Sequence, residues 1–178
     1  MLRTDKPIYK VILILNLLFI VAGIVFSIIG FTNANMNTTR IISNIADIAC
    51  LVFAAFYIFG GYTKSAAKYY KMFGVFLAVR FFISVLSGSV NSKPTLSIMV
   101  ATFSLVLILV LLLSENLGKT KSFVLCGLLV IIQLVLLIVG KDKSVGFIIS
   151  NLVRQDLACL YGIMTYAKYL DKAERGTK

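Results

Sequence analysis

Long apolar segments alternate with short polar clusters along almost the whole chain. None of these segments shows the strict alternation of apolar and polar residues that is typical of a membrane barrel strand. Each is close to the roughly 20 residues that a helix needs to cross a hydrocarbon layer about 30 Å thick. The pattern predicts an all-α polytopic integral membrane protein with six transmembrane helices, at residues 8–31, 41–62, 72–90, 95–114, 122–140 and 145–168.

The composition supports this interpretation. Of the 178 residues, 60% are hydrophobic and only 14% are charged, whereas soluble domains are about half apolar. The length is that of one domain, and we expect residues 1–178 to form a single six-helix transmembrane domain. Residues 8–31 are expected to be retained as the first span, because no small-x-small cleavage site follows their long apolar run.

Basic residues are distributed unevenly between the two sides of these spans. With the N-terminus inside, twelve of the 18 Lys and Arg residues lie on the inner side, four lie outside and two lie within spans. Cytoplasmic loops are enriched in Lys and Arg, so we expect a multi-pass protein of the cell membrane with both termini cytoplasmic. The short loops and lysine-rich ends are typical of a bacterial protein. The inner residues are Arg3, Lys6, Lys10, Lys64, Lys68, Lys71, Lys119, Lys121, Lys168, Lys172, Arg175 and Lys178.

The same distribution accounts for most of the net charge of +11. The inner charges are split among four segments, so we expect them to attract the anionic headgroups of the lipid bilayer rather than nucleic acid. The richest of these segments is a predicted loop that includes Lys64–Lys71. Its lysines and tyrosines favour anchoring at the membrane interface, and docking of a partner protein there is the alternative.

Four charged residues lie inside the predicted spans, namely Asp47, Arg80, Arg154 and Asp156. A charge at mid-bilayer costs at least about 2.5–3.5 kcal/mol, so such residues usually face a bundle interior and pair with one another. Counting inward from the outer ends of the spans places these four at depths of roughly 9–17 Å. Two positive and two negative charges then share one layer, and we expect them to neutralise one another.

Helix geometry limits which of these charges can pair. Arg154 and Asp156 are two residues apart, about 200° around the helix, and cannot face each other. We expect Arg80 to pair with Asp47 or Asp156, and Arg154 to take the other carboxylate. Amide side chains extend the polar layer, and Gln133 is a further candidate for it. The predicted ligand-binding residues are Asn44, Asp47, Arg80, Asn151, Arg154, Gln155 and Asp156.

Two spans also resemble each other around their aspartates. The strings IISNIADIACL (Ile41–Leu51) and IISNLVRQDLACL (Ile148–Leu160) each place an aliphatic-Ala-Cys-Leu string after the aspartate. Thr102 lies about halfway between the two aspartates. The pattern favours three tandem helical hairpins of one orientation, although such short strings also recur by chance in a chain so rich in aliphatic residues.

Charges buried in this way favour functions from two different classes. A polar cavity would make the chain a small membrane transporter, or a membrane-embedded solute-binding subunit, for a small polar or ionic solute. Alternatively, the ion pairs only fix helix packing in a non-transport assembly, immunity or regulatory protein. We expect no enzymatic activity, cofactor or metal, because the chain has no histidine and no Walker loop. Neither aspartate has the Gly-x-Gly-Asp surround of intramembrane aspartyl proteases.

In size, six spans and cytoplasmic termini, the predicted architecture resembles the substrate-binding subunits of bacterial energy-coupling-factor vitamin transporters. The first helix of those subunits carries an Ala-x-x-x-Ala type patch that docks their motor. The corresponding string here, NLLFIVAGIVFSIIG (Asn16–Gly30), contains only Ala22. The resemblance is one of architecture, so we assign no membership and transfer no residue roles.

Overall fold

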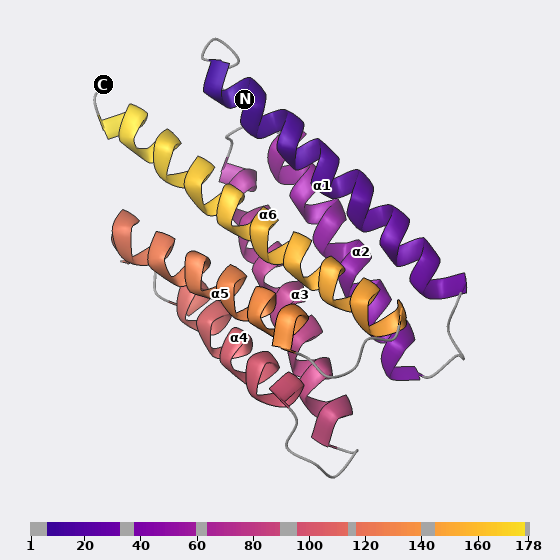
Figure 1. Ribbon diagram of the computed structural model, residues 1–178. Helices are drawn as coiled ribbons and strands as arrows, with labels where there is room; N and C mark the ends of the chain where they lie inside the picture. The colour runs from indigo at the N-terminus through magenta and orange to yellow at the C-terminus, as the bar shows by residue number, and fades with distance from the viewer. Residues whose placement is uncertain are drawn as a thin grey trace.

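The computed structural model describes residues 7–32, 38–59, 64–89, 96–113, 117–139 and 145–176, and every regular element in these ranges is an α-helix. The predicted all-α class is therefore confirmed. The helices are α1 (Pro7–Thr32), α2 (Thr38–Phe59), α3 (Lys64–Ser89), α4 (Leu96–Leu113), α5 (Lys119–Val139) and α6 (Val145–Gly176) (Figure 1).

The helices follow the predicted apolar segments because those segments are long and contain no internal proline. Both prolines of the chain lie where a helix tolerates them. Pro7 is the first residue of α1, where its fixed φ suits the first turn, and Pro94 precedes α4.

One predicted loop is wrong, and one helix extends about two turns beyond its predicted span. Lys64–Lys71 was predicted as a loop, but it forms the first two turns of α3. This stretch contains Ala66 and Ala67, together with lysines, and these are strong helix formers with no glycine or proline between them. For the same reason α6 continues to Gly176 rather than ending at residue 168. Charged residues at a helix end were mistaken for a loop.

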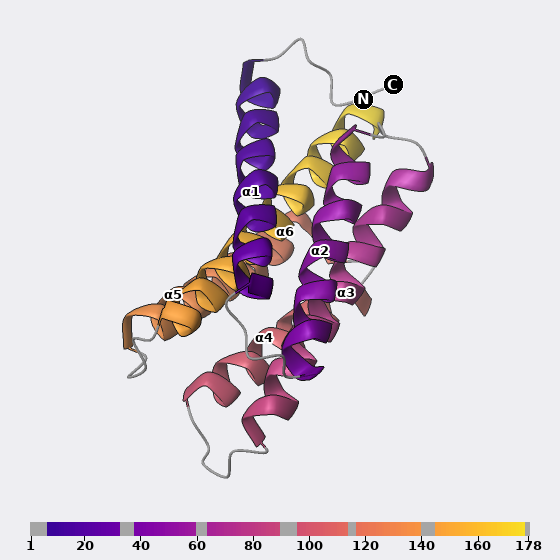
Figure 2. The same cartoon turned by 90° about the vertical axis from the view of Figure 1, so that its right-hand side faces the viewer.

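The six helices close into a ring in which each packs against its neighbours in the chain and α6 returns to α1 (Figures 1 and 2). Helix α6 also contacts α2 and α3, so one of its faces is directed into the interior. The start of α1 and the end of α6 lie at the same end of the bundle, which we call the terminal end (Figure 1). The other end is called the distal end.

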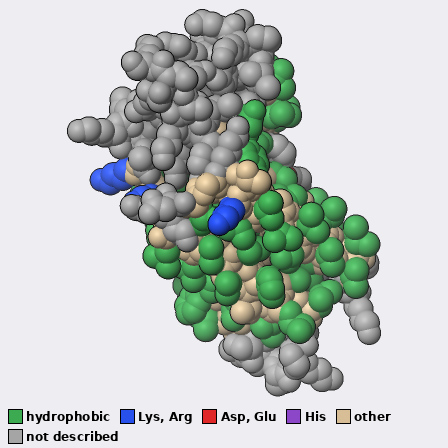
Figure 3. All heavy atoms as spheres, turned by 90° about the vertical axis from the view of Figure 1, so that its left-hand side faces the viewer, with side chains coloured by type: hydrophobic (Ala, Val, Ile, Leu, Met, Phe, Trp, Pro, Cys, Tyr) green, Lys and Arg blue, Asp and Glu red, His purple; other side chains and the backbone are tan. Residues whose placement is uncertain are grey.

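The outer surface of the bundle is strongly apolar. Hydrophobic side chains cover most of the described surface on the face shown in Figure 3, where the few Lys and Arg side chains gather in one band. Among the described residues, three helices contain a stretch long and apolar enough to cross a membrane, at Lys68–Leu86, Leu96–Leu113 and Thr120–Val139. A shorter apolar stretch covers Ile41–Tyr57 in α2. These properties are compatible with a membrane protein.

Candidate functional site

Three of the four charged residues predicted inside the spans lie at one level of the bundle. Asp47 is nine residues from the distal end of α2, which is Thr38. Arg80 and Arg154 are also nine residues from the distal ends of their helices, Ser89 and Val145. At 1.5 Å per residue this level lies about 14 Å inside the distal end. All three side chains are buried.

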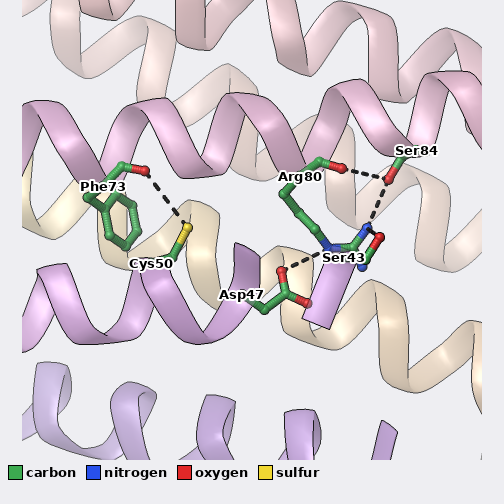
Figure 4. A network of polar contacts seen from close by, with 6 residues as sticks. All are labelled: Ser43, Asp47, Cys50, Phe73, Arg80 and Ser84. Carbon is green, nitrogen blue, oxygen red and sulfur yellow. Dashed lines mark hydrogen bonds and ion pairs between the residues drawn. The ribbon is translucent and has the colours of Figure 1, made fainter. Parts of the chain in front are cut away.

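Asp47 and Arg80 form an ion pair between α2 and α3. Arg80 Nε donates to Asp47 Oδ1 at 2.8 Å, and the two side chains point toward each other in Figure 4. Arg80 Nη1 donates to Ser43 Oγ at 3.3 Å and to Ser84 Oγ at 3.0 Å. The predicted pairing of Arg80 with Asp47 is therefore confirmed. The two serines supply further acceptors, which a buried guanidinium needs in order to offset its desolvation.

Arg154 approaches this ion pair from α6. Its Nη2 donates to Asn151 Oδ1 at 2.9 Å, one turn earlier on the same helix. Its guanidinium interacts electrostatically with both Asp47 and Arg80. The side chains of Asn151 and Arg154 are buried, with exposed fractions of 1% and 7%. We call these residues the polar layer: Ser43, Asp47, Ser84, Arg80, Asn151 and Arg154.

The expected neutral quartet of charges is thus incomplete. Asp156 is half-buried and lies about 200° around α6 from Arg154, away from the face that meets the ion pair. Within the described part of the chain, Asp156 has no ion-pair partner. The polar layer therefore contains two arginines and one aspartate.

The other predicted site residues lie beside this layer. Asn44 is half-buried on α2, one turn before Asp47. Gln155 is half-buried on α6, and its Oε1 is shielded from solvent without a donor among the described residues. The structure therefore places Asn44 and Gln155 at the right level but assigns neither of them a bond to the ion pair.

Buried polar residues on α4 and α5 continue the same level. Ser104 is eight residues from Leu96, the distal end of α4, and Gln133 is six residues from Val139, the distal end of α5. Gln133 Nε2 donates to Ser104 Oγ at 2.6 Å, and both side chains are at most 1% exposed. Sequence reasoning named Gln133 only as a further candidate and missed Ser104, because a serine inside an apolar helix gives no distinct signal.

A second cluster of polar and aromatic residues lies nearer the terminal end. Tyr70 and Thr165 share a hydrogen bond of 2.8 Å between their hydroxyls, and Tyr57 donates to the carbonyl oxygen of Met164 at 3.2 Å. The Tyr161 ring stacks on Tyr70 at a centroid distance of 5.2 Å. Sequence reasoning missed this cluster. We call it the tyrosine layer, and its members are Tyr57, Tyr70, Phe73, Cys126, Tyr161 and Thr165.

The residues that suggested a repeat do not have equivalent surroundings. Asp47 is buried and paired, whereas Asp156 is half-buried. Thr102 is exposed, and its hydroxyl donates to the carbonyl oxygen of Ile98 at 2.8 Å in its own helix. Three hairpins can be drawn along the chain, but α2 also packs on α3 and α4 on α5. The structure therefore provides no equivalence of sites among the hairpins.

Comparison with known proteins adds no assignment, since no family model, curated protein or solved structure matches this chain. The chemistry of the site must be read from its own side chains. Among the described residues, no group of three or more His, Cys, Asp or Glu side chains is placed to hold a metal ion. Guanidinium and carboxamide groups dominate the site, and these bind oxyanions and hydrogen-bonding solutes.

Proposed function

We propose that the chain crosses the cell membrane six times, with both termini in the cytoplasm. Three helices with apolar stretches of membrane-spanning length support this proposal, as do the lengths of α1 and α6, which have 26 and 32 residues. The uneven distribution of Lys and Arg supports the orientation. In this orientation the terminal end of the bundle is cytoplasmic, and the polar layer lies between the outer surface and the bilayer centre.

We further propose that the protein is a small transporter, or the solute-binding membrane subunit of one, and that its solute is anionic or carries an anionic group. The observation that carries this proposal is the burial of three charged side chains, two of them arginines, at one level of the bundle. Two buried arginines face one buried aspartate across three helices. Charged residues inside a membrane usually pair with one another or line a water-filled cavity or a substrate pathway.

The roles of the two arginines differ in this proposal. Arg80 is held by Asp47, Ser43 and Ser84, so it shapes the layer and keeps its charge in place. Arg154 is held through Asn151 on its own helix, and its guanidinium is the group that receives the anion. The tyrosine layer closes the interior on the cytoplasmic side, so the solute reaches Arg154 from the outside.

Binding by the purified protein in lipid nanodiscs tests this function. The probes are chloride, phosphate and propionate, each added over a range of concentrations while the unfolding temperature is measured. A ligand at 100 times its Kd stabilises the folded state by about 2.7 kcal/mol, so a specific anion should raise the unfolding temperature measurably. Arg154→Gln should abolish this shift and leave the yield of folded protein unchanged.

The matched control is Lys121→Gln, which removes a positive charge from an exposed position on α5. The anion-induced shift should survive in this variant, because Lys121 lies outside the polar layer. A wild-type protein that none of the three anions stabilises would contradict the proposal. An equal loss of the shift in both variants would also contradict it, since the effect would then follow net charge rather than the site.

A second function rests on the ion pair itself. Asp47 and Arg80 are buried and satisfied by neighbouring side chains, as expected for charges that only specify helix packing in a non-transport membrane protein. In that case Arg154→Gln would lower the stability of the protein and no anion would bind. The same experiment therefore separates the two functions.

A further inference from the structure

Two buried amide oxygens near the polar layer have no hydrogen-bond donor among the described residues. They are Oε1 of Gln133 on α5 and Oε1 of Gln155 on α6. A buried acceptor without a partner costs about 1–3 kcal/mol, so such groups are rare in folded proteins. A hydrogen-bond donor from a bound molecule would therefore satisfy these two oxygens.

The orientation of the Gln133 amide is fixed by Ser104. The Ser104 hydroxyl donates its only proton to the carbonyl oxygen of Val100 at 2.7 Å. It can therefore only accept a hydrogen bond from Gln133, and that bond uses Nε2 at 2.6 Å. A flipped amide would put two acceptors face to face. The open atom of Gln133 is thus an oxygen, and it requires a donor.

The packing of α5 on α6 brings the two glutamines to the same level. Cys126 lies against Gly162, where an added Cβ would be 3.7 Å from the cysteine Cβ, and Phe123 contacts Tyr166 with ring centroids 5.3 Å apart. Gln133 is seven residues after Cys126, and Gln155 is seven residues before Gly162. Seven residues are about two helical turns, so on antiparallel helices both glutamines return to the same line of contact.

Asn151 connects this line of contact to the arginine. It lies four residues before Gln155, hence on the same side of α6, and its Oδ1 accepts a hydrogen bond from Arg154. An anionic group on Arg154 would therefore have carboxamide oxygens nearby on the α5 side. The site combines one cationic donor with acceptors that need donors.

We propose that Gln133 and Gln155 belong to the binding site, and that the solute is a small organic carboxylate that also bears hydrogen-bond donors. Hydroxy acids and amino acids have this chemistry. The carboxylate binds the guanidinium of Arg154, and the hydroxyl or ammonium group donates to the glutamine oxygens. This inference rests on the proposed function, because it names the class of solute for the same site.

Matched ligands test the inference directly in nanodiscs. The first set is propionate, lactate and alanine, which share a three-carbon frame and differ only in a hydrogen, hydroxyl or ammonium at the second carbon. The second set is 4-methylpentanoate and leucine, which differ in the same way at a larger size. In at least one set, the ligand with a donor should bind roughly tenfold more tightly than the plain carboxylate, as measured by titration calorimetry.

The variants Gln133→Met and Gln155→Met should each weaken binding of the donor-bearing ligand more than binding of the plain carboxylate, and so reduce this difference. Gln133→Met leaves the bond from Ser104 to Val100 in place, so the helix contact is preserved. Leu134→Met, at an exposed neighbouring position, is the control and should keep the full difference. Because only a donor-bearing ligand needs the acceptor, the affinities of the two ligands should become more similar in the glutamine variants.

Three outcomes overturn the inference. If every donor-bearing ligand binds no more tightly than its plain carboxylate, the anion site stands but the glutamines do not contribute to it. If both glutamine variants keep the full difference, or change only the unfolding temperature, their oxygens are satisfied by water and have no role in binding. If no carboxylate binds the wild-type protein at all, the proposed function fails as well.

Discussion

The polar layer and the tyrosine layer lie in the same bundle but are built in different ways. Asp47 and Tyr57 are ten residues apart on α2, so the two layers are separated by about 15 Å. The polar layer is held by charged side chains that bind one another across α2 and α3. The tyrosine layer is held by stacked rings, and the hydroxyls of Tyr57 and Tyr70 bond to the carbonyl oxygen of Met164 and to Thr165, respectively.

The two layers therefore differ in their ability to attract a charged solute. Stacked rings fill space by shape, and Tyr70, Phe73 and Tyr161 leave the interior closed without any charge. Charged groups attract a partner of opposite sign, and the polar layer has one more cation than anion. In the proposed function, the tyrosine layer closes the bundle and the polar layer receives the solute.

Removal of one member of the ion pair should have the largest effect on stability. Arg80→Leu leaves the Asp47 carboxylate buried without its partner, and such changes cost about 3–5 kcal/mol. We expect a matching fall in the free energy of unfolding in lipid bicelles, together with a lower yield of folded protein. The ion pair of the polar layer would then be essential for folding.

The double variant Asp47→Leu/Arg80→Leu is the control for this prediction. Replacing both members of a buried ion pair by apolar residues is often neutral, so most of the lost stability should return. If the double variant is as unstable as Arg80→Leu, the cost arises from altered packing of α2 on α3. The comparison of the two layers by charge would then be invalid.

The helices of this fold were predictable because long apolar segments without internal proline leave the chain few alternatives. The start of α3 was not, since the polar residues of Lys64–Lys71 fit both a loop and the end of a helix. Hydrophobic patterns identify the part of a helix that lies in apolar surroundings. They do not identify turns that continue beyond it.

The ion pair between Asp47 and Arg80 could be predicted because opposite charges at one depth have few other partners. The position of Asp156 could not, since the rotation of α6 follows from its packing against four other helices. The tyrosines gave no signal either, because tyrosine near the end of a span is typical of the membrane interface. Whether such a residue faces lipid or the interior depends on the whole bundle.

A change in the tyrosine layer should have an intermediate effect. An added Cβ at Gly74 would lie 2.5 Å from Leu112 Cδ2 and 3.0 Å from the Tyr161 hydroxyl oxygen. Gly74→Ala should therefore displace the Leu112 side chain and crowd the Tyr161 hydroxyl. Overpacking of this kind costs about 1–3 kcal/mol. The free energy of unfolding and the near-ultraviolet circular dichroism of the tyrosines would report this change.

Gly127→Ala is the matched control, because an added Cβ at this exposed position on α5 would meet nothing within 4 Å. Alanine is the better helix former by about 1 kcal/mol, so the control should be neutral or slightly stabilising. Anion binding should persist in Gly74→Ala if the layers are independent. Loss of binding there would show that closure of the tyrosine layer and the charge of the polar layer are coupled.

The smallest effect is expected when a hydroxyl is removed from the tyrosine layer and its ring is kept. Tyr57→Phe removes the bond to the carbonyl oxygen of Met164 but retains the contact of its ring with Tyr70, at a centroid distance of 6.1 Å. Hydrogen bonds between membrane helices contribute about 0.6 kcal/mol on average, so unfolding should change by less than about 1 kcal/mol. Tyr57→Leu, which also removes the ring, should cost more. If Tyr57→Phe is instead as damaging as Arg80→Leu, hydrogen bonds rather than shape hold this layer closed, and the contrast between the two layers disappears.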